Sequence, residues 1–298
     1  MFRYQVRDIH MTDTNKNGFV PVENGELFYQ QSGLGEQQVL WVHGLPLDSR
    51  AWYPQLQYFN QRCQNTVFDL RGYGKSSKLP EHPNDVTDIY MNDFLSVLEY
   101  CHLEKPTLVG FASAGHAVLR FAALFPDKIS KLIVINGSPC FMKCDSWEGG
   151  FSSQSLKDMA SKIELVETDD EIYDDLLSAA MNEHGGEALK ALKAWYMKLA
   201  KGSGRATINA FFSSIATDDD RALMSRIIAP TLIISSRLGQ EVPSGTALFL
   251  RQTIPNSQLF ELNDIDHFAY ATKSGLLNQV IEQFISPQCD INLPTNLG

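Results

Sequence analysis

The segment Leu108-Val109-Gly110-Phe111-Ala112-Ser113-Ala114-Gly115 constrains the fold of this chain more than any other. An apolar run, residues 106–109, leads into a turn bounded by glycine, and residues 117–125 follow with the small and apolar composition of a helix. Small residues at Gly110, Ala114 and Gly115 let such a helix pack close against a sharp turn. The segment therefore predicts a strand, a strained turn and a helix in direct succession.

Position 112 is the centre of this predicted turn. In the G-x-S-x-G pattern, which has the same strand–turn–helix setting, the residue two after the first glycine carries the nucleophile. Counting from Gly110, that residue is Ala112, which has no nucleophilic atom. A slip of one residue would make Ser113 the nucleophile, but it would put bulky Phe111 where a small residue is needed, so this alternative is less favoured. Either the protein does no acyl chemistry, or its chain is a disarmed form of one that does.

The composition excludes several classes of function. With 298 residues, 44% hydrophobic and 20% charged, the chain fits one large α/β domain or two small ones. A net charge of −10 and a pI of about 5.2 disfavour binding to nucleic acid or to an anionic membrane. Five scattered cysteines, an odd number, favour free thiols in a reducing compartment and no metal site. The N-terminus has no apolar signal region, so we expect a soluble, cytoplasmic protein.

The order of the predicted elements indicates the fold class. Strand and helix patterns alternate along the chain, which favours a mostly parallel, doubly wound α/β sheet with helices on both faces. The alternation breaks between Cys140 and Arg226, where the sequence is polar and helical in character. We expect a single domain over residues 1–298, with a helical cap at residues 139–226 and a disordered tail at residues 287–298.

Two other segments supply the remaining parts of an acyl-transfer site. The loop that begins at His43 follows an early strand, where the N–H of Leu45 would bind a developing oxyanion together with the N–H of Ser113. His267 follows the last predicted strand, which is the place and chain order expected of the general base. His116, beside the turn, is expected to lie at the surface or a helix end.

The acid that would orient His267 is missing from its usual place. An aspartate is expected a few residues before the Val-Pro pair at 242–243, and Gly239 stands there. Glu241 is the nearest carboxylate, and Asn136 is a polar alternative at the end of the preceding strand. Loss of the acid costs about 10⁴-fold in known triads and loss of the nucleophile about 10⁶-fold, so Ala112 decides the activity.

Taken together, these residues resemble the α/β-hydrolase superfamily over residues 19–285. The resemblance implies an α/β-hydrolase fold with a helical cap, a nucleophile position at 112 and a base at His267. The segments that carry it are residues 43–52, 69–76, 110–115, 242–243 and 266–267.

A narrower resemblance concerns the entrance to the cap. Residues 137–141 and 145–149 are similar to this part of the carboxylesterases that demethylate pimeloyl-acyl-carrier-protein methyl ester in biotin synthesis. That family has serine at position 112 and aspartate at 239. A serine-to-alanine replacement would account for the first difference, and the second would be a divergence. The resemblance implies that Phe141 and Trp147 guard the acyl slot.

An acidic carrier protein would need a basic docking patch on this acidic chain. The cap offers such residues at helical spacing, although an ordinary solvated helix face is the alternative interpretation. The residues of the predicted helix and its end are Lys190, Lys193, Lys198, Lys201 and Arg205, and Lys143 and Lys157 add to them on the entrance side.

The sequence thus predicts a carboxylic ester hydrolase that acts through a serine acyl-enzyme, here in an inactive form with Ala112. Its preferred substrate would be pimeloyl-acyl-carrier-protein methyl ester, and no cofactor is implied. One alternative is a non-catalytic ligand-binding protein on the same fold. Another is a cofactor-free lyase or dioxygenase that uses His267 without a serine.

Overall fold

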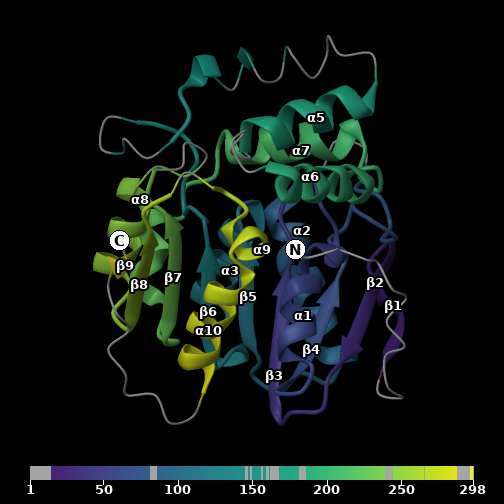
Figure 1. The fold of residues 1–298 in the computed structure, drawn as a ribbon, viewed down its shortest axis with the longest axis vertical. Helices are drawn as coiled ribbons and strands as arrows, with labels where there is room; N and C mark the ends of the chain where they lie inside the picture. Colours follow the sequence, from purple (N-terminus) through teal and green to yellow (C-terminus); the bar gives the residue numbers. More distant parts are fainter. Residues whose placement is uncertain are drawn as a thin grey trace.

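A mostly parallel sheet forms the centre of the computed structural model (Figure 1). The structure describes residues 15–80, 86–144, 147, 150–155, 157–158, 161, 168–180, 186–238, 242, 244–264, 266–286 and 296–297. The strands lie in the order β1-β2-β4-β3-β5-β6-β7-β8-β9, antiparallel from β1 to β4 and parallel beyond. Their bounds are β1 Lys16–Val22, β2 Gly25–Ser32, β3 Gln37–Val42, β4 Cys63–Phe68, β5 Thr107–Phe111, β6 Lys131–Ile135, β7 Thr231–Ser236, β8 Ser257–Leu262 and β9 Asn296–Leu297. The predicted fold class is confirmed.

Helices cover both faces of this sheet, because successive strand residues point to opposite faces and both sets are apolar. On β5, Leu108 packs with α2, α3 and α8, whereas Val109 and Phe111 pack with α1 and α10 on the other face. The helices of the sheet layers are α1 Tyr53–Phe59, α2 Val86–Tyr100, α3 Ser113–Leu124, α8 Ser244–Thr253, α9 Ala269–Thr272 and α10 Ser274–Ile285.

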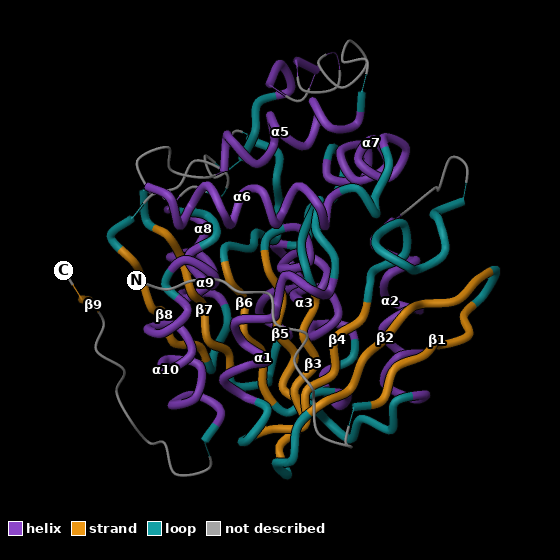
Figure 2. The backbone as a smooth tube through the Cα atoms, turned by 45° about the vertical axis from the view of Figure 1, so that its right-hand side comes forward, coloured by secondary structure: helices purple, strands orange, loops and turns teal. Residues whose placement is uncertain are grey.

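Three helices of the segment between β6 and β7 form a layer above the sheet (Figures 1 and 2). They are α5 Asp169–Ala180, α6 Gly186–Ala200 and α7 Arg205–Ile215. Apolar side chains on α5 and α7, among them Tyr173, Ile208 and Ile215, form a small core of their own. Short 3-10 turns complete the described elements: η1 Ser49–Trp52, η2 Pro126–Lys128 and η3 Arg221–Arg226, the last of which packs against α3.

Three boundaries differ from the sequence expectation. Helix α3 begins at Ser113, four residues before the predicted start, because the turn at Ala112 leads directly into it. The sequence pair Asn24-Gly25 is typical of a two-residue hairpin loop, but the loop between β1 and β2 is Glu23–Asn24, since Gly25 already pairs with Val22. In the predicted tail, residues 296–297 pair with β8, and the rest of residues 287–298 lies outside the described residues.

Buried polar contacts fix the loop that follows β4 against the loop that follows β3. The carboxylate of Asp69 accepts the N–H of Ser49 at 2.9 Å and that of Lys75 at 2.8 Å. The imidazole of His43 accepts the N–H of Leu70 at 3.0 Å. Each bond satisfies a buried main-chain donor that would otherwise be costly. These contacts place the loop around residue 45 at the carboxyl edge of the sheet.

Candidate active site

The turn between β5 and α3 holds Ala112 at a positive φ. Its φ and ψ are 51° and −114°, a conformation that costs a residue with a Cβ about 1–3 kcal/mol. The N–H of Ala112 donates to the carbonyl of Ile135 on β6 at 3.0 Å. The side chain at position 112 therefore projects from a strained bend at the carboxyl edge of the sheet.

Close packing around this bend leaves no room for a Cβ at two glycines. A Cβ on Gly110 would lie 2.5 Å from Val118, and one on Gly44 would lie 2.7 Å from the carbonyl oxygen of Phe111. A Cβ on Gly110 would also lie 2.8 Å from the carbonyl oxygen of Ala114, so in both cases main-chain atoms of α3 or β5 would have to shift. The glycines thus bring the loop after β3 and the start of α3 against the bend.

Ala112 lines a pocket of about 120 Å³. The neighbouring Ser113 and three predicted site residues from distant parts of the chain, Leu45, Phe141 and His267, line the same pocket. The other lining residues are apolar and come mainly from the cap: Pro46, Phe151, Leu176, Leu177, Phe211, Phe212, Ile215, Val242 and Phe268.

Sequence reasoning missed these apolar lining residues. Phe211, Phe212 and Ile215 lie on α7 at the spacing of a helical face, so their periodicity was a usable signal. Phe151 lies in an irregular part of the cap, where no periodic pattern marks it.

His267 lies in the loop after β8 and is only 8% exposed. Its ring centroid is 4.8 Å from that of Phe111. Burial lowers the pKa of His267 to about 4, because a charged imidazole would lose its hydration there. At neutral pH the ring is therefore uncharged and able to accept a proton.

The carboxylate next to His267 in sequence is engaged elsewhere. The Asp266 carboxylate accepts the N–H of Phe268 at 2.9 Å and the hydroxyl of Thr272. Within the described residues, burial alone accounts for the pKa of His267, with no contribution from a carboxylate. Gly239 and Glu241, the predicted acid position and its substitute, lie outside the described residues.

Asn136 contacts the main chain of the histidine loop. Its side-chain N–H donates to the carbonyl of His267 at 2.8 Å, and its oxygen accepts the N–H of Ser236 at 2.8 Å. The Ser236 hydroxyl in turn donates to the carbonyl of Asp266 at 2.6 Å. These bonds fasten the loop to the ends of β6 and β7, so Asn136 positions His267 through its backbone.

The two expected oxyanion donors lie together, but one is already engaged. The N–H of Leu45 donates to the side-chain oxygen of Ser113 at 2.8 Å. Ser113 is the first residue of α3, where main-chain N–H groups have no acceptor within the helix. The Ser113 hydroxyl thus faces the Leu45 amide.

Trp147, unlike Phe141, is not among the described residues that line the pocket. Its indole N–H donates to the carbonyl of Cys140 at 3.1 Å, and its ring packs on Phe249 of α8 with centroids 5.1 Å apart. The guanidinium of Arg221 covers the ring at 5.4 Å. These contacts hold the start of the cap against the sheet layer, so a substrate-binding role for Trp147 has no support from its position.

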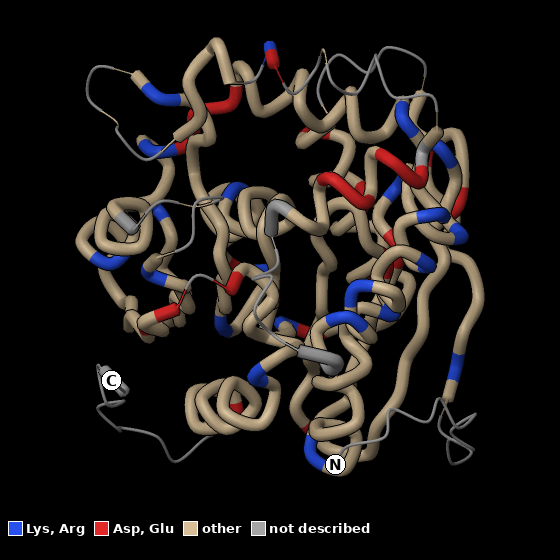
Figure 3. The backbone as a smooth tube through the Cα atoms, turned by 45° about the horizontal axis from the view of Figure 1, so that its top comes forward, with Lys and Arg blue, Asp and Glu red and all other residues tan. Residues whose placement is uncertain are grey.

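Two of the predicted carrier-binding lysines pair with acidic residues of the neighbouring helix. Lys193 of α6 lies 2.8 Å from Asp174 of α5, and Lys201 lies 3.0 Å from Asp170. Basic and acidic segments are interspersed over the chain rather than gathered by sign (Figure 3). The other predicted residues are exposed at Lys143, Lys157, Lys190 and Lys198, and half-buried at Arg205.

His116 lies near the N-terminal end of α3, one of its two expected places, but it is not at the surface, because its ring is 2% exposed within a buried charge cluster. Its Nδ1 lies 2.9 Å from the carbonyl of Ser138, and its Nε2 lies 3.2 Å from Asp220. Arg120 donates to Asp220 at 2.7 Å and lies 3.2 Å from Asp218. The cluster joins the end of the cap to α3, and the i,i+4 spacing of His116 and Arg120 was its sequence signal.

The partners of Asp218 in this cluster lower the pKa of its carboxyl group. Burial alone would raise that pKa, but hydrogen bonds from His116 and Thr87 and the charge of Arg120 hold it below its usual range. Asp218 is therefore ionised at neutral pH, and its charge is compensated inside the protein.

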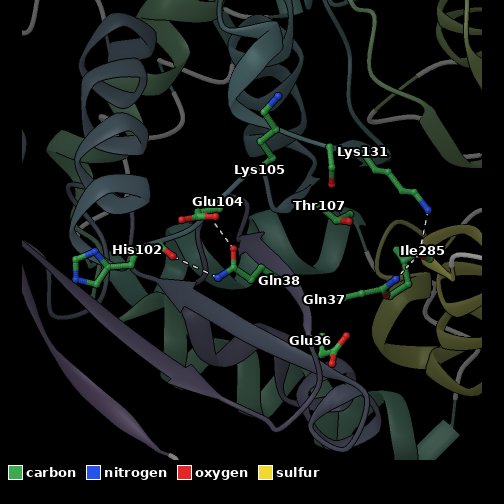
Figure 4. Close-up of a pocket in the computed structure, with 10 residues that line it drawn as sticks. Glu36, Gln37, Gln38, His102, Glu104, Lys105, Thr107, Lys131 and Ile285 are labelled. Carbon is green, nitrogen blue, oxygen red and sulfur yellow. Dashed lines mark hydrogen bonds between the residues drawn. The ribbon is translucent and has the colours of Figure 1, made fainter.

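A larger hollow of about 620 Å³ lies at the opposite edge of the sheet (Figure 4). Several of its polar groups are used in local contacts: Gln38 donates to the carbonyl of His102, and Lys131 to that of Ile285. Volume alone therefore does not mark the site. The hollow is lined by Glu36, Gln37, Gln38, His102, Glu104, Lys105, Thr107, Ser130, Lys131 and Ile285.

The described residues also bear on the expectations for cysteines, metal sites and membrane-spanning helices. Cys63, Cys101, Cys140 and Cys144 are free thiols, as predicted, and Cys289 lies outside the described residues. Within the described part of the chain, no group of three or more His, Cys, Asp or Glu side chains could hold a metal ion. No helix among the described residues has the length and apolarity that a membrane span requires.

Known proteins resemble this chain over most of its length. The AB hydrolase superfamily protein YisY of Bacillus subtilis is 27% identical and covers 88% of this chain and 96% of its own length. A pimeloyl-[acyl-carrier protein] methyl ester esterase of Aeromonas hydrophila is 23% identical, covering 86% and 98%. The solved esterase EaEST of Exiguobacterium antarcticum has a TM-score of 0.82 at 20% identity, covering 91% and 100%.

The match to a family model agrees with the geometry. The model described as the alpha/beta hydrolase fold matches residues 38–274, which include the bend at Ala112, the cap and His267. The parallel sheet, the cap inserted after β6 and the histidine after β8 have the order that this fold requires. The chain belongs to the α/β-hydrolase family.

Proposed function

We propose that this pocket is the acyl-binding site of a carboxylic ester hydrolase, with position 112 as its nucleophile position, and that Ala112 leaves the chain able to bind such ligands without forming an acyl-enzyme. One observation carries the proposal. Ala112 keeps a φ of 51°, which strains any residue with a Cβ and which an alanine with a purely structural role would not require. The bend instead presents residue 112 to the pocket that His267 also lines.

The chemistry of a form with serine at position 112 follows from the residues that line the pocket. A serine hydroxyl at 112 would attack the ester carbonyl while neutral His267 takes its proton. The same imidazolium would then protonate the leaving alkoxide, and His267 would activate water to release the acid. Main-chain N–H groups of Leu45 and Ser113 are the candidate donors for the oxyanion. Alanine removes the attacking atom, and loss of a nucleophile costs about 10⁶-fold.

The size of the pocket favours a short acyl group. A volume of about 120 Å³ is somewhat less than that of an apolar cavity of about 150 Å³ that holds benzene. The lining is aromatic and aliphatic, and burial leaves the pocket without a charged histidine at neutral pH. A short-chain ester therefore suits the pocket better than a long or charged acyl chain.

A methyl ester carried by an acyl carrier protein is the second candidate substrate. It is favoured by relatives such as the one from Aeromonas hydrophila, whose name states that activity. Exposed Lys198 would be a docking residue, whereas Lys193 and Lys201 already pair with acidic side chains. A K198E substitution should then weaken hydrolysis of carrier-protein esters by an A112S enzyme and leave p-nitrophenyl acetate unaffected. Equal effects on both substrates would remove this candidate.

Restoration of the nucleophile tests the proposal. The A112S variant should hydrolyse p-nitrophenyl acetate and p-nitrophenyl butyrate well above the rate of the parent chain, with a burst of p-nitrophenol. A matched A112S/H267Q protein should lose this activity, because the serine then has no base. If A112S folds, shown by an unchanged circular dichroism spectrum, and gives neither burst nor turnover, the hydrolase proposal fails. A ligand-binding protein on this fold would then be the better interpretation.

A further inference from the structure

The hydroxyl of Ser113 stands where a substrate oxygen would have to bind. The N–H of Leu45 donates to it at 2.8 Å, although the two residues are 68 positions apart in sequence. Both residues line the pocket beside Ala112. A stabilised oxyanion must lie about 2.7–3.1 Å from its donors. The serine oxygen already occupies that distance from Leu45.

Two oxygen atoms cannot both occupy this place. A carbonyl or carboxylate oxygen of a ligand would reach the Leu45 N–H only after the Ser113 side chain had rotated away, breaking its hydrogen bond. Otherwise the ligand oxygen keeps the main-chain N–H of Ser113 alone. In known enzymes the loss of one oxyanion donor lowers kcat by about 10²–10³-fold.

The local backbone makes this contact a stable one. Gly44 brings the loop after β3 within touching distance of the bend, since a Cβ there would lie 3.3 Å from that of Ala112. Ser113 is fixed as the first residue of α3. Because the backbone of both residues is tightly packed, the contact can be broken only by rotation of the Ser113 side chain.

We propose that Ser113 is an internal plug of the oxyanion hole, so that this chain is silenced at two points, the missing nucleophile at 112 and the occupied amide at 45. This inference rests on the proposed function and concerns the same pocket. Its consequence is that a serine restored at 112 works at only part of its capacity while Ser113 keeps its hydroxyl. It also follows that carboxylate and carbonyl ligands bind the parent chain more weakly than the shape of the pocket allows.

The first test measures binding and does not need activity. Butyrate is titrated calorimetrically into the parent chain and into the S113A variant. We expect S113A to bind butyrate about tenfold more tightly, because the Leu45 N–H becomes available. S113T keeps a hydroxyl and should gain less than S113A. The control S213A alters an exposed serine of α7 and should behave as the parent. Equal affinities of S113A and the parent chain would overturn the plug.

The second test measures catalysis in the restored background. The kcat of A112S/S113A for p-nitrophenyl acetate should exceed that of A112S by at least tenfold. If both proteins hydrolyse the ester at equal rates, the plug is overturned while the hydrolase proposal stands. If neither protein hydrolyses it, the hydrolase proposal fails, and the butyrate affinities alone decide the role of Ser113.

Discussion

The side-chain amide of Asn136 donates to the main-chain carbonyl of His267 at 2.8 Å, joining the end of β6 to the loop that carries the candidate base. Both residues are buried, at 4% and 8% exposure. The contact holds the backbone of the loop that carries the imidazole.

Removal of the Asn136 side-chain amide should therefore make the position of the His267 imidazole less well defined. N136A in the A112S background should lower kcat for p-nitrophenyl acetate more than it changes KM, since the pocket lining stays intact. It should also cost about 1–3 kcal/mol of stability, because the carbonyl of His267 and the N–H of Ser236 lose their partner. Steady-state kinetics and urea unfolding measure the two effects. A change in KM alone would contradict a positioning role.

The buried histidine predicts how stability depends on pH. The pKa of His267 is about 4 in the folded protein against about 6.5 in the unfolded chain. The unfolded chain binds the proton first, so stability falls as the pH drops from about 6.5 towards 4 and is unaffected above that range. The full loss is of the order of 3 kcal/mol. Urea unfolding at pH 7 and pH 4.5 should show a smaller difference for H267Q than for the parent chain. Identical pH dependence would show that the imidazole is not buried.

The positive φ of Ala112 can be tested through stability. A112G should raise the free energy of unfolding by up to about 1 kcal/mol, because glycine adopts this conformation without strain. The same change at Ala117, within α3, should lower it by about 1 kcal/mol. Thermal unfolding of both variants provides the comparison. If A112G is destabilised as much as A117G, the bend is not strained.

Arg120 should be far more important for stability than an exposed arginine. R120A would leave Asp218 and Asp220 buried without their main counter-charge, which costs about 3–5 kcal/mol. R251A, at an exposed position on α8, should change stability by less than about 1 kcal/mol. Urea unfolding distinguishes these values. A small effect of R120A would mean that the other partners of the two carboxylates, His116 and Thr87 among them, stabilise them without the guanidinium.

The parts of the fold that could be predicted are those with local signals. The segment around Gly110 and the histidine after the last long strand were found because their neighbours must be small or lie at a strand end. The start of α3 was placed too late, since no propensity rule marks a helix that begins directly at a strained residue. The contact between Ser113 and Leu45 could not be predicted, because it joins loops 68 residues apart.

Pairing between elements changes the electrostatic surroundings that a charge pattern within one helix suggests. Lys193 and Lys201 looked like a basic face on one helix, but the acidic residues of α5 lie beside them. A surface position was also expected for His116, because its partners Asp218 and Asp220 lie about 100 residues away in sequence, at the far end of the cap. Charge patterns within one helix cannot reveal which neighbour will neutralise them.

The insertion of the cap between two adjacent strands has an evolutionary consequence. Strands β6 and β7 are paired residue for residue, so the excursion between them leaves the sheet register intact. Leu45, Ala112 and His267, which line the pocket from the carboxyl edge of the sheet, therefore keep their positions when the inserted segment changes. Most of the apolar lining residues belong to that one segment. A protein descended from this one could therefore bind a different ligand by replacing the inserted segment alone, with the sheet and its loops unchanged.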